Sequence, residues 1–122
     1  MSVVDSRYGS LRVIDTDSII SRSLTLYGEW AQREIDLLSL FISSGDVVID
    51  AGSFIGTHAL AFAAIVGTSG RVLAFEPRKS FAAILRENIC RANFDNVELE
   101  ERGLGTARDC VKVPSIDLTC TE

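Results

Sequence analysis

The sequence contains no run of lysine or arginine and little positive charge overall. Its 12 basic side chains are outnumbered by 17 acidic ones, which gives a formal net charge of −5. Nucleic acids and anionic membrane surfaces attract clustered positive charge. The composition therefore argues against both as partners.

Cysteine and long apolar runs are also scarce. The three cysteines are odd in number and lack C-x-x-C spacing, so neither a disulfide framework nor a zinc site is indicated. The longest apolar stretch, Ala59 to Val66, is too short to span a bilayer, and residues 1–10 do not read as a signal peptide. We expect a cytoplasmic protein with reduced thiols, no bound metal and no membrane span.

The first part of the chain gives weak signals before one clear helix. Residues 1–26 are treated as an N-terminal extension, in which Leu11 to Ile14 alternates like an edge strand or hairpin arm. Residues 29–43 predict an amphipathic helix that ends near Gly45. The side chains expected on its buried face are Trp30, Ile35, Leu38, Phe41 and Ile42.

Strand and helix patterns then alternate. The β-branched run Val47 to Ile49 predicts a strand buried on both faces of a parallel sheet. Helices are expected over residues 55–66 and 80–92, and strands over 72–75, 97–100 and, less regularly, 110–113 before Pro114. This order predicts the first βαβαβ half of a Rossmann-like, doubly wound α/β fold. Residues 27–122 would form a partial domain that lacks the later strands.

The main functional signal is the loop Asp50 to Gly56 between the first expected strand and its helix. Gly52 and Gly56 supply positions without Cβ, where the backbone can bend and a ligand can approach it. Their G-x-x-x-G spacing differs from the G-x-G-x-x-G of loops that bind a pyrophosphate. The loop therefore favours a cofactor without phosphates, although such a run is also common in structural turns.

An acid at the end of the next strand completes the predicted site. Glu76 follows Gly56 by 20 residues and can accept hydrogen bonds from both hydroxyls of a ribose, worth about 1 to 3 kcal/mol. Adenosine joined to an amino acid is S-adenosylmethionine, whose amino-acid end Asp50 and the loop backbone could hold. His58 could act as a base, but a structural role in the first turn of a packed helix is favoured.

At these residues the sequence resembles the FkbM-type S-adenosylmethionine-dependent methyltransferases, which are described as O-methyltransferases. The resemblance extends roughly from Tyr27 to Gly105 and is carried by 27–29, 45–58 and 70–77, with Ser53-Phe54 in place of the family's common Ala-Asn. It implies a methyl acceptor that is a hydroxyl of a small molecule or sugar. It also implies cofactor contacts from Tyr27, Glu29, Asp50, Gly52, Ser53, Gly56 and Glu76; no catalytic base is assigned.

The resemblance places Val113 to Leu118 just before a fourth strand that would pair with the first. Without that strand, Val47 to Ile49 forms an exposed apolar edge that a homodimer or another partner is expected to cover. Two functions remain open: a cofactor-binding methyltransferase module, or a truncated non-catalytic domain that acts in oligomerisation or partner binding. A nicotinamide oxidoreductase is disfavoured because the three-glycine loop is absent.

Overall fold

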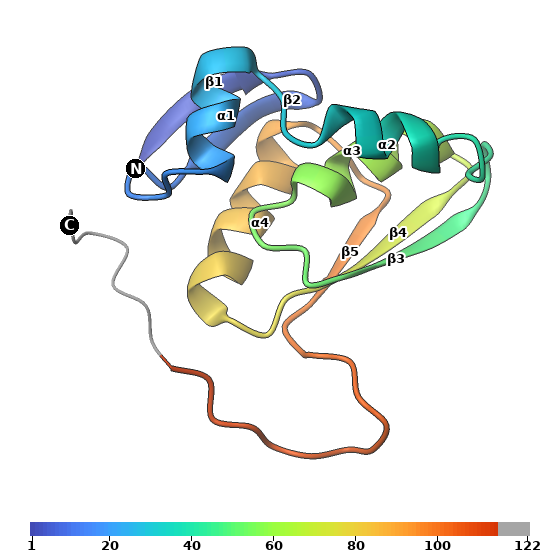
Figure 1. The fold of residues 1–122 in the computed structure, drawn as a ribbon. Helices are drawn as coiled ribbons and strands as arrows, with labels where there is room; N and C mark the ends of the chain where they lie inside the picture. Colours follow the sequence, from blue (N-terminus) through green and yellow to red (C-terminus); the bar gives the residue numbers. More distant parts are fainter. Residues whose placement is uncertain (115–122) are drawn as a thin grey trace.

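The computed structural model describes residues 1–114, which form a small parallel sheet, helices packed on it and an N-terminal hairpin (Figure 1). The strands are β1 (Ser2–Ser6), β2 (Gly9–Val13), β3 (Val47–Ala51), β4 (Arg71–Phe75) and β5 (Val97–Glu100). The helices are α1 (Ile20–Tyr27), α2 (Gln32–Leu38), α3 (Thr57–Val66) and α4 (Lys79–Arg91).

The central sheet has the order β3-β4-β5, and both pairs of neighbours are parallel. Each crossover between successive strands contains a helix, α3 and then α4. This arrangement confirms the predicted βαβαβ unit and brings the carboxyl ends of β3 and β4 side by side. The loops that follow these two ends contain the predicted site residues.

One face of the sheet is packed and the other is open. Val72 and Ala74 are fully buried, and Val48 packs with them against α3. On the opposite face, Val47 and Ile49 are 57% and 59% exposed, so the prediction of a strand buried on both faces was wrong. A β-branched run favours a strand, but it does not say whether a second layer covers that strand.

The N-terminal residues are better structured than their polar sequence suggests. β1 and β2 pair antiparallel, which confirms a hairpin arm near Leu11 to Ile14. Leu11 and Val13 join a core cluster with Leu60 of α3 and Ile84 of α4. Helix α1 was not predicted, although Asp17 accepts hydrogen bonds from the N–H groups at positions 19, 20 and 21 at its start.

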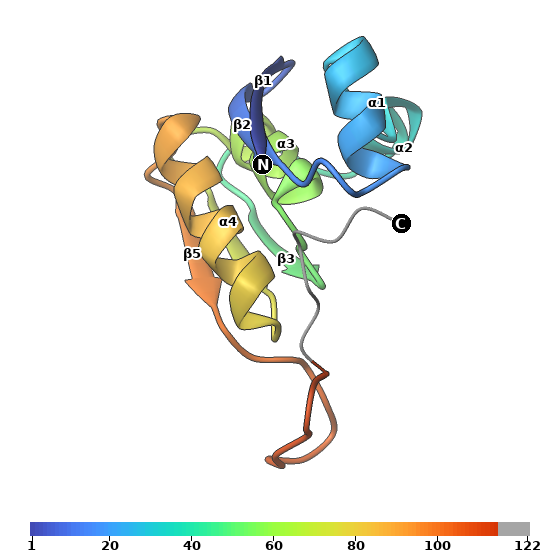
Figure 2. The ribbon, with the colours of Figure 1, turned by 90° about the vertical axis from the view of Figure 1, so that its left-hand side faces the viewer.

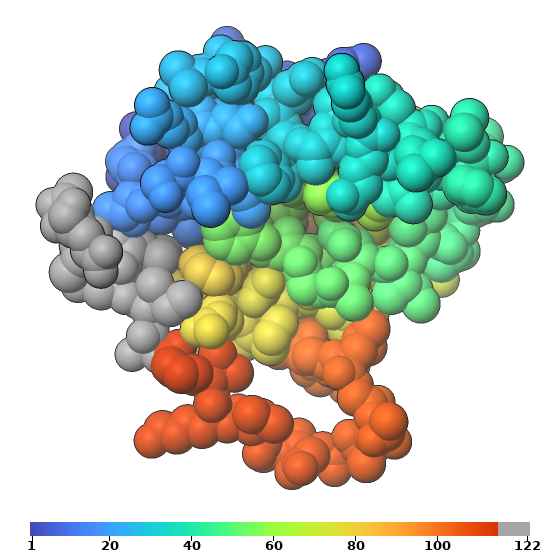
Figure 3. Space-filling model, viewed as in Figure 1, coloured from blue at the N-terminus to red at the C-terminus, as the bar shows by residue number. Residues whose placement is uncertain are grey.

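Two further predictions were wrong. Helix α2 covers only part of the predicted range 29–43, and Phe41, placed on its buried face, is 78% exposed because the regular helix ends at Leu38. Residues 110–113 are exposed and form no strand. Figure 3 shows the segment after β5, coloured orange to red, extending away from the packed body. The predicted segment Val113 to Leu118 lies mostly outside the described residues.

The described residues contain no membrane-spanning helix, no disulfide and no metal-binding cluster. None of their helices is both long and apolar enough to cross a membrane. Cys90 and Cys110 are free thiols, and Cys120 lies outside the described range. Within residues 1–114, no group of three or more histidine, cysteine or acidic side chains is arranged to hold a metal ion.

Candidate functional site

The loop from Asp50 to Gly56 is held tightly against the neighbouring strand. The backbone N–H groups of Gly52 and Ser53 both donate to the carbonyl of Phe75, at 2.9 and 3.0 Å. The buried Ser53 hydroxyl donates to the Asp50 carbonyl at 2.9 Å. The loop therefore turns from β3 into α3 with its backbone fixed to the end of β4, and Ser53 supports that turn.

The two loop glycines serve different purposes. Gly52 has φ +82°, and a Cβ built on it meets no protein atom within 4 Å. Gly56 has φ +101°, but its Cβ would lie 2.5 Å from Leu85 Cδ1. Gly52 thus borders free space that a ligand could occupy, whereas Gly56 allows α3 and α4 to approach closely.

Asp50 is the loop residue with unsatisfied chemistry. Its Oδ2 atom is buried and has no hydrogen-bond partner. Burial raises the pKa of the Asp50 carboxyl, an effect that Ser53 and the nearby His58 partly oppose. A buried carboxylate oxygen without a partner is costly, and an ammonium group would satisfy it.

Glu76 has the opposite character, because the protein already holds both of its oxygens. Oε2 accepts the Phe54 N–H and Oε1 accepts the Arg78 N–H, each at 2.9 Å. The side chain is only 5% exposed. Since each carboxylate oxygen has two lone pairs, the group keeps acceptor capacity for a ribose diol. Glu76 also ties the glycine loop to the start of α4, a structural role that the sequence analysis missed.

Phe54 occupies a backbone conformation that bulky residues rarely adopt. Its φ is +52°, and its N–H bond to Glu76 helps to hold it there. Its ring packs edge-on against Phe81, with centroids 4.7 Å apart, and the Arg78 guanidinium lies 5.9 Å from the Phe81 ring centre. Phe54 therefore forms an aromatic pair with Phe81 beside Glu76.

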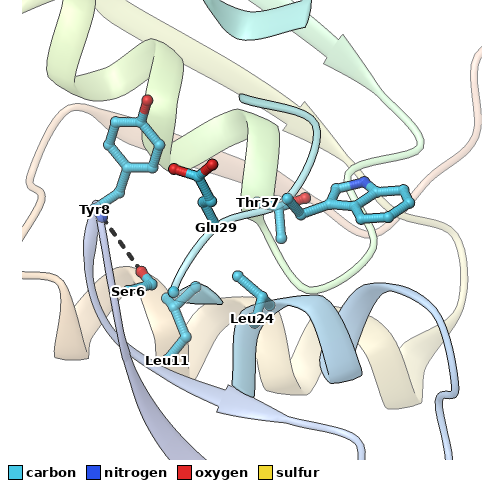
Figure 4. Close-up of a pocket in the computed structure, with 8 residues that line it drawn as sticks. Ser6, Tyr8, Leu11, Leu24, Glu29 and Thr57 are labelled. Atoms are coloured by element: carbon cyan, nitrogen blue, oxygen red, sulfur yellow. Dashed lines mark hydrogen bonds between the residues drawn. The ribbon is translucent and has the colours of Figure 1, made fainter. Parts of the chain in front are cut away.

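The structure does not bring Tyr27 and Glu29 into this group. Tyr27 is 75% exposed at the end of α1. Glu29 pairs with Arg7 at 3.3 Å and lines a small pocket beneath the hairpin, together with Tyr8 and Thr57 (Figure 4). No hydrogen bond or ion pair within residues 1–114 joins either residue to Asp50 or Glu76.

His58 lies in the first turn of α3 and binds a neighbouring helix. Its Nε2 atom is 2.9 Å from Glu34 Oε1 of α2, and its ring packs edge-on against Phe62. Through these contacts His58 packs within α3 and attaches α2 to α3. They agree with the structural role favoured from the sequence.

The fold is that of S-adenosylmethionine-dependent methyltransferases. Residues 11–106 match the family model described as protein-L-isoaspartate(D-aspartate) O-methyltransferase (PCMT), and the chain belongs to this family. The match does not support the FkbM-type resemblance in particular. Members of the matched class take S-adenosylmethionine as methyl donor, which agrees with the cofactor inferred from the sequence.

Several solved structures share this fold. A candidate rRNA methylase from Clostridium thermocellum is 28% identical, with a TM-score of 0.57 and coverage of 62% of this chain and 41% of that one. A SAM-dependent O-methyltransferase from Thermotoga maritima is 21% identical, with a TM-score of 0.58 and coverage of 83% and 40%. Coclaurine N-methyltransferase bound to N-methylheliamine and SAH is 22% identical, with a TM-score of 0.54 and coverage of 84% and 32%. The matched part of the chain therefore covers between 32% and 41% of the length of these proteins.

Proposed function

We propose that this chain binds S-adenosylmethionine between Asp50, Gly52 and Glu76 and forms the cofactor-binding part of an O-methyltransferase. The observation that carries the proposal is the free space beside Gly52, with the unpartnered Asp50 oxygen in the same loop. Ligands of doubly wound sheets lie at the carboxyl ends of the strands, where both features are found.

The residues fit the two ends of this cofactor. Glu76 has the acceptor capacity to bind the ribose hydroxyls, and Asp50 would satisfy its free oxygen with the ammonium group of the methionine end. Gly52 would let the ligand lie against the backbone. When bound, the cofactor supplies a methyl group on a sulfonium; the chain's own residues bind and orient it.

The proposed acceptor is an oxygen nucleophile, namely a hydroxyl of a small molecule or sugar. The FkbM-type resemblance suggests a hydroxyl, and the matched family's name describes O-methylation at isoaspartate, so both support oxygen. The acidic composition disfavours RNA, despite the methylase among the structural neighbours. Methyl transfer to a panel of hydroxylated small molecules and an isoaspartyl peptide would separate the two acceptor classes.

Matched glycine variants test the cofactor site. Gly52→Ala adds a methyl group toward the proposed ligand, at φ +82°. Gly45→Ala imposes a comparable strain at φ +90° but lies at the opposite end of β3, where its Cβ makes an ordinary 3.5 Å contact with Ser69. By calorimetric titration, Gly52→Ala should weaken binding at least about tenfold, a difference of about 1.4 kcal/mol, and Gly45→Ala should leave it unchanged. Equal effects in both variants would refute the proposed site.

The open face of the sheet favours a second function, in oligomerisation or partner binding. Val47 and Ile49 are more than half exposed there, and β3 has no neighbour on its outer edge among the described residues. Sedimentation equilibrium distinguishes the alternatives. A defined dimer without affinity for S-adenosylmethionine would favour the interaction function, whereas retained cofactor binding favours the methyltransferase module.

A further inference from the structure

Asn88 of α4 is a fully buried polar residue, and its amide contacts two distant segments. Its Oδ1 accepts the backbone N–H of Arg12 at 2.6 Å, and its Nδ2 donates to the Arg12 carbonyl at 3.0 Å. The same Nδ2 donates to the Ile55 carbonyl at 2.9 Å. Asn88 has no exposed surface; its bond to Ile55 is buried, and its two bonds to Arg12 are partly buried.

The pair of bonds to Arg12 joins the hairpin to α4. The Asn88 amide binds both the N–H and the carbonyl of Arg12, as a neighbouring strand would. These two groups lie on the edge of β2 that faces away from β1. Figure 2 shows β2 near the C-terminal half of α4, and Gly9 of the hairpin approaches Ala92 so closely that a Cβ there would lie 2.8 Å from the alanine Cβ. The N-terminal hairpin is thus bound to α4 by a specific polar contact as well as by the apolar core.

The third bond reaches the glycine loop at Ile55. Ile55 is fully buried and follows Phe54, whose N–H is held by Glu76 and whose backbone is left-handed. Asn88 fixes the carbonyl of Ile55, and therefore the orientation of the peptide plane that leads into Gly56. The loop is held from one side by the acid of the site and from the other by Asn88.

We propose that Asn88 is a positioning residue that sets the glycine-loop conformation for S-adenosylmethionine and couples loop order to docking of the hairpin. The inference rests on the proposed function of the loop. Asn88 contacts no cofactor atom in this account; it acts through the Ile55 carbonyl. Because coupling between sites is reciprocal, cofactor binding should also stabilise the hairpin contact.

A pair of asparagine variants separates positioning from general stability. Asn88→Asp removes the amide donor that serves both the Ile55 and the Arg12 carbonyls. Asn96→Asp is the matched control, because the Asn96 amide donates to two carbonyls, of Ala63 and Gly67, at the far end of α3. At pH 8, Asn88→Asp should raise the Kd for S-adenosylmethionine about tenfold relative to wild type, as expected for losing the one buried hydrogen bond that reaches the glycine loop. Asn96→Asp should lower the melting temperature without changing that Kd.

The pH dependence gives a readout that simple destabilisation would not produce. When the carboxyl introduced by Asn88→Asp is protonated, it regains an O–H donor for the Ile55 carbonyl, so the ratio of variant to wild-type Kd should fall as the pH is lowered toward about 5.5. A ratio that is constant with pH, or equal losses in both variants, would overturn the positioning role. If wild type itself fails to bind, the proposed function and this inference fall together; if it binds and Asn88→Asp binds equally well, only the inference falls.

Hydrogen exchange on the wild-type chain tests the same coupling without any substitution. Addition of S-adenosylhomocysteine should slow exchange of the Arg12 amide several-fold, because that N–H is donated to Asn88. Slower exchange confined to residues 50–56 and 76–78 would show that the hairpin is not coupled to the site. This measurement decides the question even if the Asn88→Asp variant does not fold.

Discussion

Strands β3 and β4 are neighbours in one sheet, but their side chains are used differently. β4 lies between two partners, its inward residues Val72 and Ala74 are fully buried, and it leads to Glu76, whose oxygens both accept backbone hydrogen bonds. β3 has one partner among the described residues and exposes Val47, and the carboxylate of Asp50 keeps one oxygen unpaired.

β4 belongs to the scaffold of the site, whereas β3 contributes the part that is open to a ligand. β4 pairs with a strand on each side, and both oxygens of Glu76 accept backbone hydrogen bonds, so the protein itself holds this side of the site in place. β3 exposes the apolar side chains of Val47 and Ile49, and Asp50 has a buried oxygen without a hydrogen-bond partner. Binding of a ligand or a neighbouring chain at β3 would therefore stabilise the protein more than binding at β4. A cofactor at the end of the strand and a neighbour at its edge would satisfy these groups independently.

The largest expected effect comes from placing the same charge on both strands. Val72→Lys should lower the free energy of unfolding by about 3 to 5 kcal/mol, because it buries a cation without a partner. Val47→Lys should change it by less than about 1 kcal/mol, since that side chain is mostly in water. Urea denaturation measures both, and similar losses would mean that the two strands are equally enclosed.

Removal of the Glu76 carboxylate should have the next largest effect. Glu76→Ala leaves the Phe54 and Arg78 N–H groups without their acceptor, which should cost about 2 to 3 kcal/mol of stability. The same variant should lose cofactor affinity. Thermal denaturation and titration of this variant check both effects. An unchanged melting temperature would show that Glu76 does not hold the loop.

Asp50→Asn should change stability and binding in opposite directions. Burial raises the pKa of Asp50, so its contribution to stability is present at acid pH and is lost as the pH rises through the folded-state pKa. The neutral amide should therefore make the free protein slightly more stable at pH 7 and weaken cofactor binding about tenfold. Urea titrations at pH 4 and pH 7 measure the change in stability, and calorimetry measures the change in cofactor binding. A less stable variant at pH 7 would contradict the proposed burial cost.

The smallest predicted effect concerns the open face of the sheet. The ion pair between Arg71 of β4 and Glu98 of β5 spans 3.1 Å, with both side chains more than half exposed. Arg71→Ala should therefore cost at most about 0.5 kcal/mol. A loss above about 1 kcal/mol that depends on protein concentration would indicate that another molecule covers this face.

The sheet and its crossover helices could be predicted because each has a strong local pattern. The alternation of Val97 and Leu99 with exposed glutamates predicted β5, and Gly67 marked the end of α3. Asp50, Gly52 and Glu76 were predicted from their places at strand ends. Whether the structure's geometry at these three residues amounts to a cofactor site stays a prediction until ligand binding is measured.

Other features depend on contacts between distant residues and carry little local signal. Helix α1 follows Asp17, whose carboxylate accepts the Ser21 N–H, in a polar stretch for which no helix was predicted. Asn88 reads as an ordinary helix residue until the fold places Arg12 and Ile55 beside it. The need for Gly56 is likewise set by Leu85, which lies 29 positions later in the sequence. Such roles arise from packing and could not be read from spacing alone.

The most direct test of the account is calorimetric titration of the full chain with S-adenosylmethionine and S-adenosylhomocysteine, with NAD as the control ligand. We predict saturable one-to-one binding of both sulfur ligands and no binding of NAD, because the loop lacks the glycine pattern for a pyrophosphate. A folded chain that binds neither sulfur ligand, or that binds NAD instead, would contradict the proposed cofactor site.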